Sequence, residues 1–100
     1  MNDSNLQLLE KLIRLNPSGM TEDWIKTVKE LKKEPTLTLE DNGFLLEFED
    51  ESYCRLEDKS GTVFYSVLNR PYVCSGMVHP IYQDRAKGIL SEVIDQLLAN

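Results

Sequence analysis

The spacing of apolar residues changes near residue 36 and divides the chain into a helical part and a strand-rich part. In the first part, apolar residues recur every three or four positions, which is the spacing of one face of an α-helix. One such stretch covers about 4–15 and another about 21–33, with Pro17 after the first and Pro35 after the second. Because proline cannot continue a helix, we expect two N-terminal helices.

In the second part, apolar and polar residues alternate, which is the period of a half-buried β-strand. Four segments show this alternation, at about 36–41, 44–48, 52–57 and 62–68, and turn-like sequences separate them. They predict a four-stranded antiparallel meander, to which 72–74 could add a fifth, short edge strand.

A final helix is expected from Pro80, because the missing N–H of proline costs nothing at the first position of a helix. Gly88 weakens this helix and suggests a close approach to another element. The apolar face of the helix is continuous and comprises Tyr82, Ala86, Ile89, Leu90, Val93, Ile94, Leu97 and Leu98. The fold class we expect is therefore α+β, a single domain over 1–100 in which the C-terminal helix packs on one face of the meander.

The first hairpin carries the strongest turn signal, Asn42-Gly43, because a type I′ turn needs positive φ at both central residues. With these two residues as the loop, Leu39 lies opposite Leu46, and Leu37 lies opposite Phe48. The apolar side chains then share one face of the sheet, whereas a slip by one residue would put them on both faces.

The second hairpin is decided by the cost of burying a charge. A two-residue loop would turn Arg55 toward the core, where an unpaired guanidinium is strongly destabilising. A three-residue loop over 49–51 avoids this and sets Cys54 opposite Leu46 and Leu56 opposite Phe44. A four-residue turn over 58–61 then brings Val63, Tyr65 and Val67 to the same core face.

Composition limits the classes of function. The chain is 41% apolar and 28% charged, within the range of globular domains, and its formal charge is −6. This charge would repel nucleic-acid phosphate and anionic membrane surfaces, so we expect no direct nucleic-acid or membrane binding. No apolar run spans a bilayer and the N-terminus does not look like a secretory signal. We therefore expect a cytoplasmic protein in which Cys54 and Cys74 are free, buried thiols.

Residues that could carry catalysis are few. His79 is the only histidine, and its spacing from Cys74 matches no established nucleophile–base or metal signature. The glycines are scattered singly, so they form no phosphate-binding loop, and the acidic run 49–51 lacks the ligand spacing of a calcium loop. We expect no catalytic residue, no metal and no cofactor, and enzyme activity is a minor hypothesis.

Charge and apolar side chains combine on the face of the sheet that points away from the predicted core. Eight acids lie between Glu40 and Asp58 against one base, Arg55. Acids at strand ends also deter aggregation of sheet edges, which is the alternative explanation. The predicted partner-binding residues are Leu45, Glu47, Glu49, Asp50, Glu51, Tyr53, Arg55, Phe64 and Leu68. Their apolar members could be covered by 72–78, by a second copy of the chain or by a different protein.

Two hypotheses of function follow. In the first, the domain is an inhibitor or immunity-type protein of a bacterium or phage, whose acidic sheet face binds a basic protein. The second rests on the run from Leu37 to Leu68, which follows a helix and resembles in outline the early strands of the small acidic chaperones of type III secretion. This resemblance implies a dimeric adaptor that binds an extended client segment.

Overall fold

The computed structural model describes residues 3–15, 26, 29–30, 35–69 and 72–99. Its elements are α1 (Asp3–Ile13), β1 (Thr36–Glu40), β2 (Gly43–Glu47), β3 (Tyr53–Lys59), β4 (Thr62–Asn69), β5 (Tyr72–Met77), the 3-10 helix η1 (Pro80–Tyr82) and α3 (Gln83–Ala99). The predicted α+β class is confirmed. The predicted helix over 21–33 lies largely outside the described residues.

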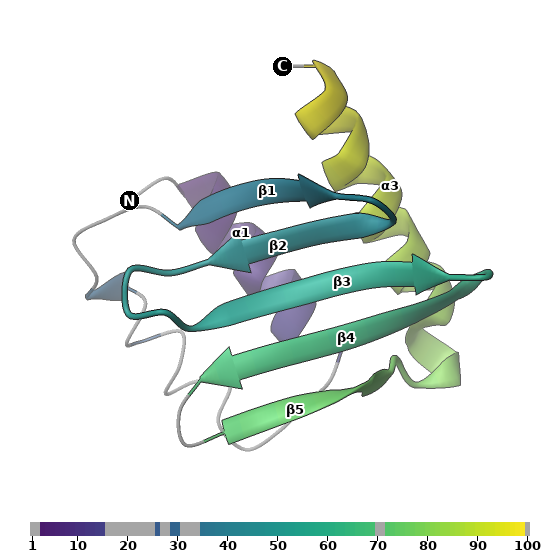
Figure 1. Ribbon diagram of the computed structural model, residues 1–100, viewed down its shortest axis with the longest axis horizontal. Helices are drawn as coiled ribbons and strands as arrows, with labels where there is room; N and C mark the ends of the chain where they lie inside the picture. Colours follow the sequence, from purple (N-terminus) through teal and green to yellow (C-terminus); the bar gives the residue numbers. More distant parts are fainter. Residues whose placement is uncertain (1–2, 16–25, 27–28, 31–34, 70–71, 100) are drawn as a thin grey trace.

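The five strands form one antiparallel sheet in the order β1-β2-β3-β4-β5, and α1 and α3 lie on the same face of it (Figure 1). The prediction of four strands with a three-residue fifth was too small, because β5 runs for six residues beside β4. The segment 72–77 therefore extends the sheet and does not cover its outer face.

The core lies between the sheet and the two helices. Phe44, Leu46, Cys54, Leu56 and Val63 are completely buried beneath the helices. The helices contribute their own buried residues, which are Leu8, Leu9, Leu12 and Ile13 from α1 and Ala86, Ile89, Leu90 and Val93 from α3. The predicted apolar face of the last helix is thus confirmed in its central part, whereas Leu98 is exposed.

The register of the first hairpin differs from the prediction by two residues, although the faces are as predicted. Leu39 pairs with Phe44 and Leu37 with Leu46, so the loop is Asp41-Asn42 and Gly43 is the first residue of β2. Glycine is needed there for packing. A Cβ on Gly43 would lie 2.7 Å from Glu57 Cα and would overlap the carbonyl oxygen of Leu56.

The second hairpin has the predicted register, with Leu46 opposite Cys54 and Phe44 opposite Leu56. Its loop closes through a hydrogen bond of 3.0 Å from the Glu51 N–H to the Phe48 carbonyl, and Glu51 has a φ of 69°. A left-handed residue at the end of a three-residue loop is a common hairpin geometry. Arg55 therefore points away from the core, as the cost of burying its charge predicted.

The type I′ turn that was predicted for the first hairpin occurs instead in the third hairpin, between β3 and β4. Ser60 and Gly61 have φ values of 57° and 88°, and Lys59 pairs with Thr62 across them. The predicted four-residue turn over 58–61 is wrong by two residues, but Val63 still faces the core. Asp58 stabilises the turn because its Oδ1 accepts a hydrogen bond of 2.7 Å from the Gly61 N–H.

Gln83 fastens the beginning of α3 to the sheet. Its Oε1 accepts a hydrogen bond of 2.9 Å from the Val63 N–H, and its Nε2 donates to the carbonyls of Val63 and Val78 at 3.0 and 2.7 Å. Just before it, His79 Nδ1 accepts a hydrogen bond of 3.2 Å from the Ile81 N–H at the start of η1. His79 thus caps the start of η1.

Candidate protein-binding surface

The sheet face opposite the helices, here called the outer face, carries most of the predicted partner-binding residues. Its members alternate with the buried residues of β2, β3 and β4, and they are Leu45, Glu47, Tyr53, Arg55, Phe64 and Leu68. The other three predicted residues, Glu49, Asp50 and Glu51, form the loop between β2 and β3. No described helix or strand lies over the outer face (Figure 1).

Cross-strand pairing brings these side chains together in rows. Tyr53 lies between Glu47 and Leu68, so an acid, an aromatic ring and an aliphatic side chain are neighbours across three strands. In the adjacent row, Leu45 lies beside Arg55. All four apolar residues of the predicted site are half-buried. Such side chains already pack against their neighbours and retain surface for a partner.

Arg55 is held by an ion pair within the sheet. Its Nε lies 2.7 Å from Oε1 of Glu40, and its Nη2 lies 3.0 Å from Oε2 of the same carboxylate. The hydrogen bond to Glu40 is the main cause that raises the pKa of Arg55 above its ordinary value. The guanidinium also lies 5.8 Å from the centre of the Tyr53 ring. Arg55 therefore packs beside the Tyr53 ring, and the Glu40 carboxylate neutralises most of the charge of Arg55.

Phe64 has a similar neighbour in Lys59, whose Nζ lies 5.0 Å from the ring centre. Lys59 also forms an ion pair of 3.4 Å with Glu57, which lies opposite Phe64 in the sheet. Each aromatic ring of the outer face therefore has a cation beside it and an acid within the same cluster. The two rings stay half-exposed to solvent, and the neighbouring cations limit how they can move.

The acidic loop has both a structural and a surface role. Asp50 Oδ1 accepts a hydrogen bond of 3.0 Å from the Ser52 backbone N–H and a second hydrogen bond from the Ser52 hydroxyl. Asp50 therefore stabilises the turn. Glu51 is exposed. A shallow hollow of about 90 Å³ joins the loop to the outer face, lined by Asp50, Glu51, Ser52, Leu68 and Asn69. Acids and an apolar side chain therefore meet at this end of the sheet.

Sequence reasoning missed two residues of the outer face, Val73 and Met77. They pair with Leu68 and Phe64, and 74% and 54% of their surfaces are exposed. The sequence signal is weak, because residues 73–77 do not alternate apolar with polar side chains. The segment was expected to be either a three-residue edge strand, 72–74, or a cover for this face over 72–78.

The two thiols differ in environment. Cys54 is completely buried beside Tyr65. Burial raises the pKa of the Cys54 thiol and of the Tyr65 hydroxyl, and the hydrogen bond between the two groups raises the pKa of Tyr65 further. Cys74 is exposed, so its predicted burial is wrong. Both cysteines lie opposite Val67, one on each side of β4, so two strand spacings of roughly 4.8 Å separate them and exclude a disulfide. Cys54 is therefore a core residue and a poor nucleophile.

Cys74 and His79 line one shallow hollow of about 120 Å³, with Tyr65 at its side. The Nδ1 of His79 is occupied by the Ile81 N–H, which gives the imidazole a structural role. Within the described ranges, no three histidine, cysteine or acidic side chains are grouped so that they could hold a metal ion.

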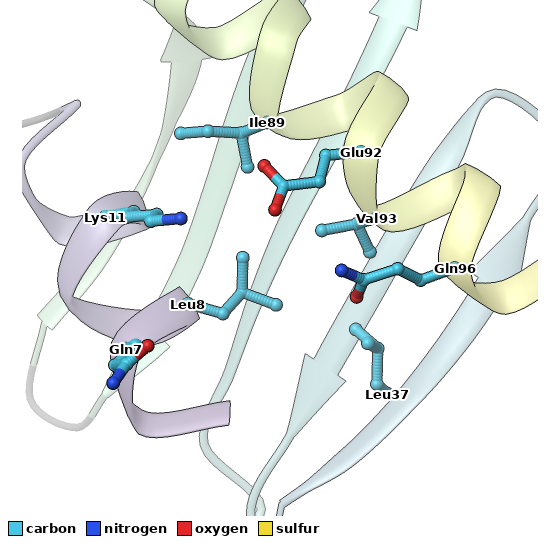
Figure 2. Close-up of a pocket in the computed structure, with 8 residues that line it drawn as sticks. All are labelled: Gln7, Leu8, Lys11, Leu37, Ile89, Glu92, Val93 and Gln96. Atoms are coloured by element: carbon cyan, nitrogen blue, oxygen red, sulfur yellow. The ribbon is translucent and has the colours of Figure 1, made fainter. Parts of the chain in front are cut away.

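A larger hollow of about 170 Å³ lies between α1 and α3 (Figure 2). Leu8, Leu37, Ile89 and Val93 form its apolar lining, and Gln7, Lys11, Glu92 and Gln96 form its polar rim. It is smaller than the pockets of roughly 300–1,000 Å³ that hold drug-sized ligands, so a single side chain of a partner would suit it better. No feature of the sequence pointed to it, because it results from the angle between two helices.

Comparison with protein-family models, with curated proteins and with solved structures found no match for this chain. In the described part of the chain, no helix is both long and apolar enough to cross a membrane.

Proposed function

We propose that this acidic domain binds another protein through its outer face, and that the partner is basic. The observation that carries the proposal is the shallow hollow that Asp50 and Glu51 of the acidic loop line together with Leu68 of the outer face. Interfaces combine an apolar or aromatic centre with a polar rim, and here Tyr53 and Phe64 would be the centre. An inhibitor or immunity-type role suits such a domain, because opposite charges accelerate and orient the encounter with a basic target.

The proposal includes a reducing compartment, the cytoplasm. Cys54 and Cys74 form no disulfide, and their separation across β4 leaves the fold without need of an oxidising environment. The net charge of −6 also supports a protein partner over nucleic acid or an anionic membrane.

The test is capture of a partner from a lysate of the source organism, followed by a binding measurement with the purified pair. A Tyr53→Ala/Phe64→Ala variant should lose affinity by about 1–3 kcal/mol per side chain, because both lie at the proposed centre. Binding should weaken as salt rises, because the partner is basic.

The matched control is Ile81→Ala/Leu98→Ala, which removes two large exposed side chains away from the outer face. This variant should bind like the wild type. Unchanged affinity in a folded Tyr53/Phe64 double variant would exclude the outer face as the binding surface. Affinity loss that tracks lost stability would mean instead that these rings belong to a small core.

The alternative is a dimeric adaptor that binds an extended client, as the resemblance to secretion chaperones implies. The observation that favours it is the exposed edge strand β5, since extended segments are bound by adding a strand to a sheet edge. Binding of the client would then be insensitive to salt and would be lost when β5 is altered, whereas the Tyr53/Phe64 variant would retain it.

A further inference from the structure

β5 is an edge strand without the usual protection against pairing. Its sequence, Tyr72–Met77, holds no charged residue and no proline, and residues 73–77 are all exposed. The opposite edge, β1, ends in Glu40, whose carboxylate is paired with Arg55. Natural proteins place charges, prolines or bulges on exposed edges because unpaired backbone groups recruit other strands.

The backbone of β5 presents N–H and C=O groups at the edge of the sheet, where a further strand can pair with them. The Val78 N–H donates a hydrogen bond of 3.0 Å to the Val63 carbonyl, so the backbone groups of even-numbered residues point toward β4. Groups alternate along an antiparallel strand, so those of Val73, Ser75 and Met77 point to the free edge. These three residues also carry their side chains on the outer face.

We propose that β5 pairs antiparallel with β5 of a second copy of the chain, with Ser75 on the two-fold axis. In this register, Val73 of each copy lies opposite Met77 of the other, and the three edge-facing residues form hydrogen-bonded pairs. The two exposed apolar side chains of one copy thus cover those of the other. Because the apolar residues Val73 and Met77 lie at equal distances on either side of Ser75, the strand is complementary to a second copy of itself, as a two-fold interface requires.

Charge favours a second copy at this edge over the basic partner. Each copy has a net charge of −6, and the uncharged β5 is a place where two copies can meet without bringing carboxylates together. Among the described residues, the nearest charged side chains of the outer face are on β3, two strands from the line along which the two β5 strands pair, here called the seam. A basic partner would gain nothing from an edge without acids.

The pairing also extends the outer face. In one copy Phe64 lies beside Met77, and in the other Val73 lies beside Leu68, so the seam joins these pairs into one apolar row. The row continues to Tyr53 of the second copy, because Tyr53 pairs with Leu68. The dimer depends only on β5, so it stands whether or not the proposed binding of a basic protein is correct.

Cross-linking tests the register. A Ser75→Cys substitution in a Cys74→Ser background places two thiols across the two-fold axis, at about the 5.5 Å Cα separation of a hydrogen-bonded pair, which a disulfide can span. Mild oxidation should convert most of this variant into a covalent dimer. The control is Ser66→Cys in the same background, since Ser66 lies beside Ser75 on β4 and is one strand from the seam. Equal cross-linking of both variants, or none of Ser75→Cys, would overturn the register.

Molecular mass in solution tests the dimer itself. The wild type should have twice the chain mass of 11.5 kDa by sedimentation equilibrium, and Val73→Lys/Met77→Lys should be a folded monomer. The control, Ile81→Lys/Leu98→Lys, makes the same chemical change at positions that are 73% and 68% exposed, and it should remain dimeric. A monomeric wild type up to millimolar concentration, or a dimeric Val73→Lys/Met77→Lys variant, would overturn the proposal and leave β5 open to a segment of another protein.

Discussion

Gly43 and Gly88 have opposite roles, and a methyl group added at each should change stability in opposite directions. At Gly43, a Cβ would overlap the backbone of β3 at Leu56 and Glu57, and backbone atoms cannot move aside. At Gly88, nothing lies within 4 Å of an added Cβ, so the close approach expected from the sequence is wrong. We expect Gly43→Ala to destabilise the protein by about 2–3 kcal/mol and Gly88→Ala to stabilise it by about 0.5–1 kcal/mol.

Urea denaturation measures both changes. The two substitutions are chemically identical, so their difference reports the surroundings of each Cα. A Gly43→Ala variant as stable as the wild type would mean that β2 and β3 are farther apart than described. A destabilised Gly88→Ala variant would mean that α3 has a neighbour at this position.

Cys54 and Tyr65 should make stability fall in alkaline solution. Burial raises the pKa of the Cys54 thiol above its ordinary value of 9.0 and that of the Tyr65 hydroxyl above 10.0. Both groups therefore stay neutral in the folded protein and ionise near their ordinary pKa values when it unfolds. The contribution of Cys54 to stability is fully present below pH 9 and that of Tyr65 below pH 10, and each is lost as the pH rises above that value, by up to ~1.4 kcal/mol per pH unit.

The free energy of unfolding between pH 8 and pH 10 tests this pair, with the slope compared between variants. Cys54→Ala should reduce the loss of stability above pH 9. In the native protein a thiol reagent should modify Cys74 and spare Cys54. Equal slopes for the wild type and Cys54→Ala would show that the thiol ionises without unfolding.

At the scale of elements, the alternation of apolar residues predicted which face of each strand is buried, but it could not fix every register. A shift by two residues leaves every side chain on the same face, so burial does not distinguish Leu39 opposite Leu46 from Leu39 opposite Phe44. Asn42-Gly43 favoured the wrong choice, because Gly43 is required by the approach of β3 and not by the turn. The second hairpin was predicted correctly because an error there would have buried Arg55.

The burial of Leu46 on β2 and of Val93 on α3 predicts how much stability each side chain contributes. Leu46 on β2 is completely buried and Val93 on α3 is 4% exposed, so both lie between sheet and helices. Leu46→Ala should destabilise the protein by about 2–4 kcal/mol, and Val93→Ala should cost somewhat less. Ile81→Ala, at a position 73% exposed, is the control and should change stability by less than ~0.5 kcal/mol in chemical denaturation. Equal small changes at all three sites would contradict this arrangement of the core.

At the scale of the whole molecule, the sequence located the acids but not their partners. Glu40 is paired with Arg55, Glu57 with Lys59, and Asp58 with a backbone N–H, so several of the eight acids are neutralised or used within the fold. The Glu40–Arg55 pair joins β1 to β3 and the Asp58 contact spans a turn, so both depend on registers that alternation alone could not decide, whereas Glu57 and Lys59 lie two residues apart on β3. Glu47 and Glu51 are exposed at the end of the outer face and are the acids best placed to attract a partner.

Reversing these two charges should therefore slow the association of a basic partner. We expect Glu47→Lys/Glu51→Lys to lower the association rate and its dependence on salt, while the dissociation rate changes little, because rim charges act mainly during encounter. Asp50 is avoided because its side chain stabilises the loop at Ser52. The control, Glu92→Lys/Asp95→Lys on α3, changes the net charge of −6 by the same amount on the helical side. Stopped-flow measurements at several salt concentrations compare the two variants. If both slow association equally, the partner responds only to total charge, and if the α3 variant has the larger effect, the binding surface lies on the helical side of the sheet.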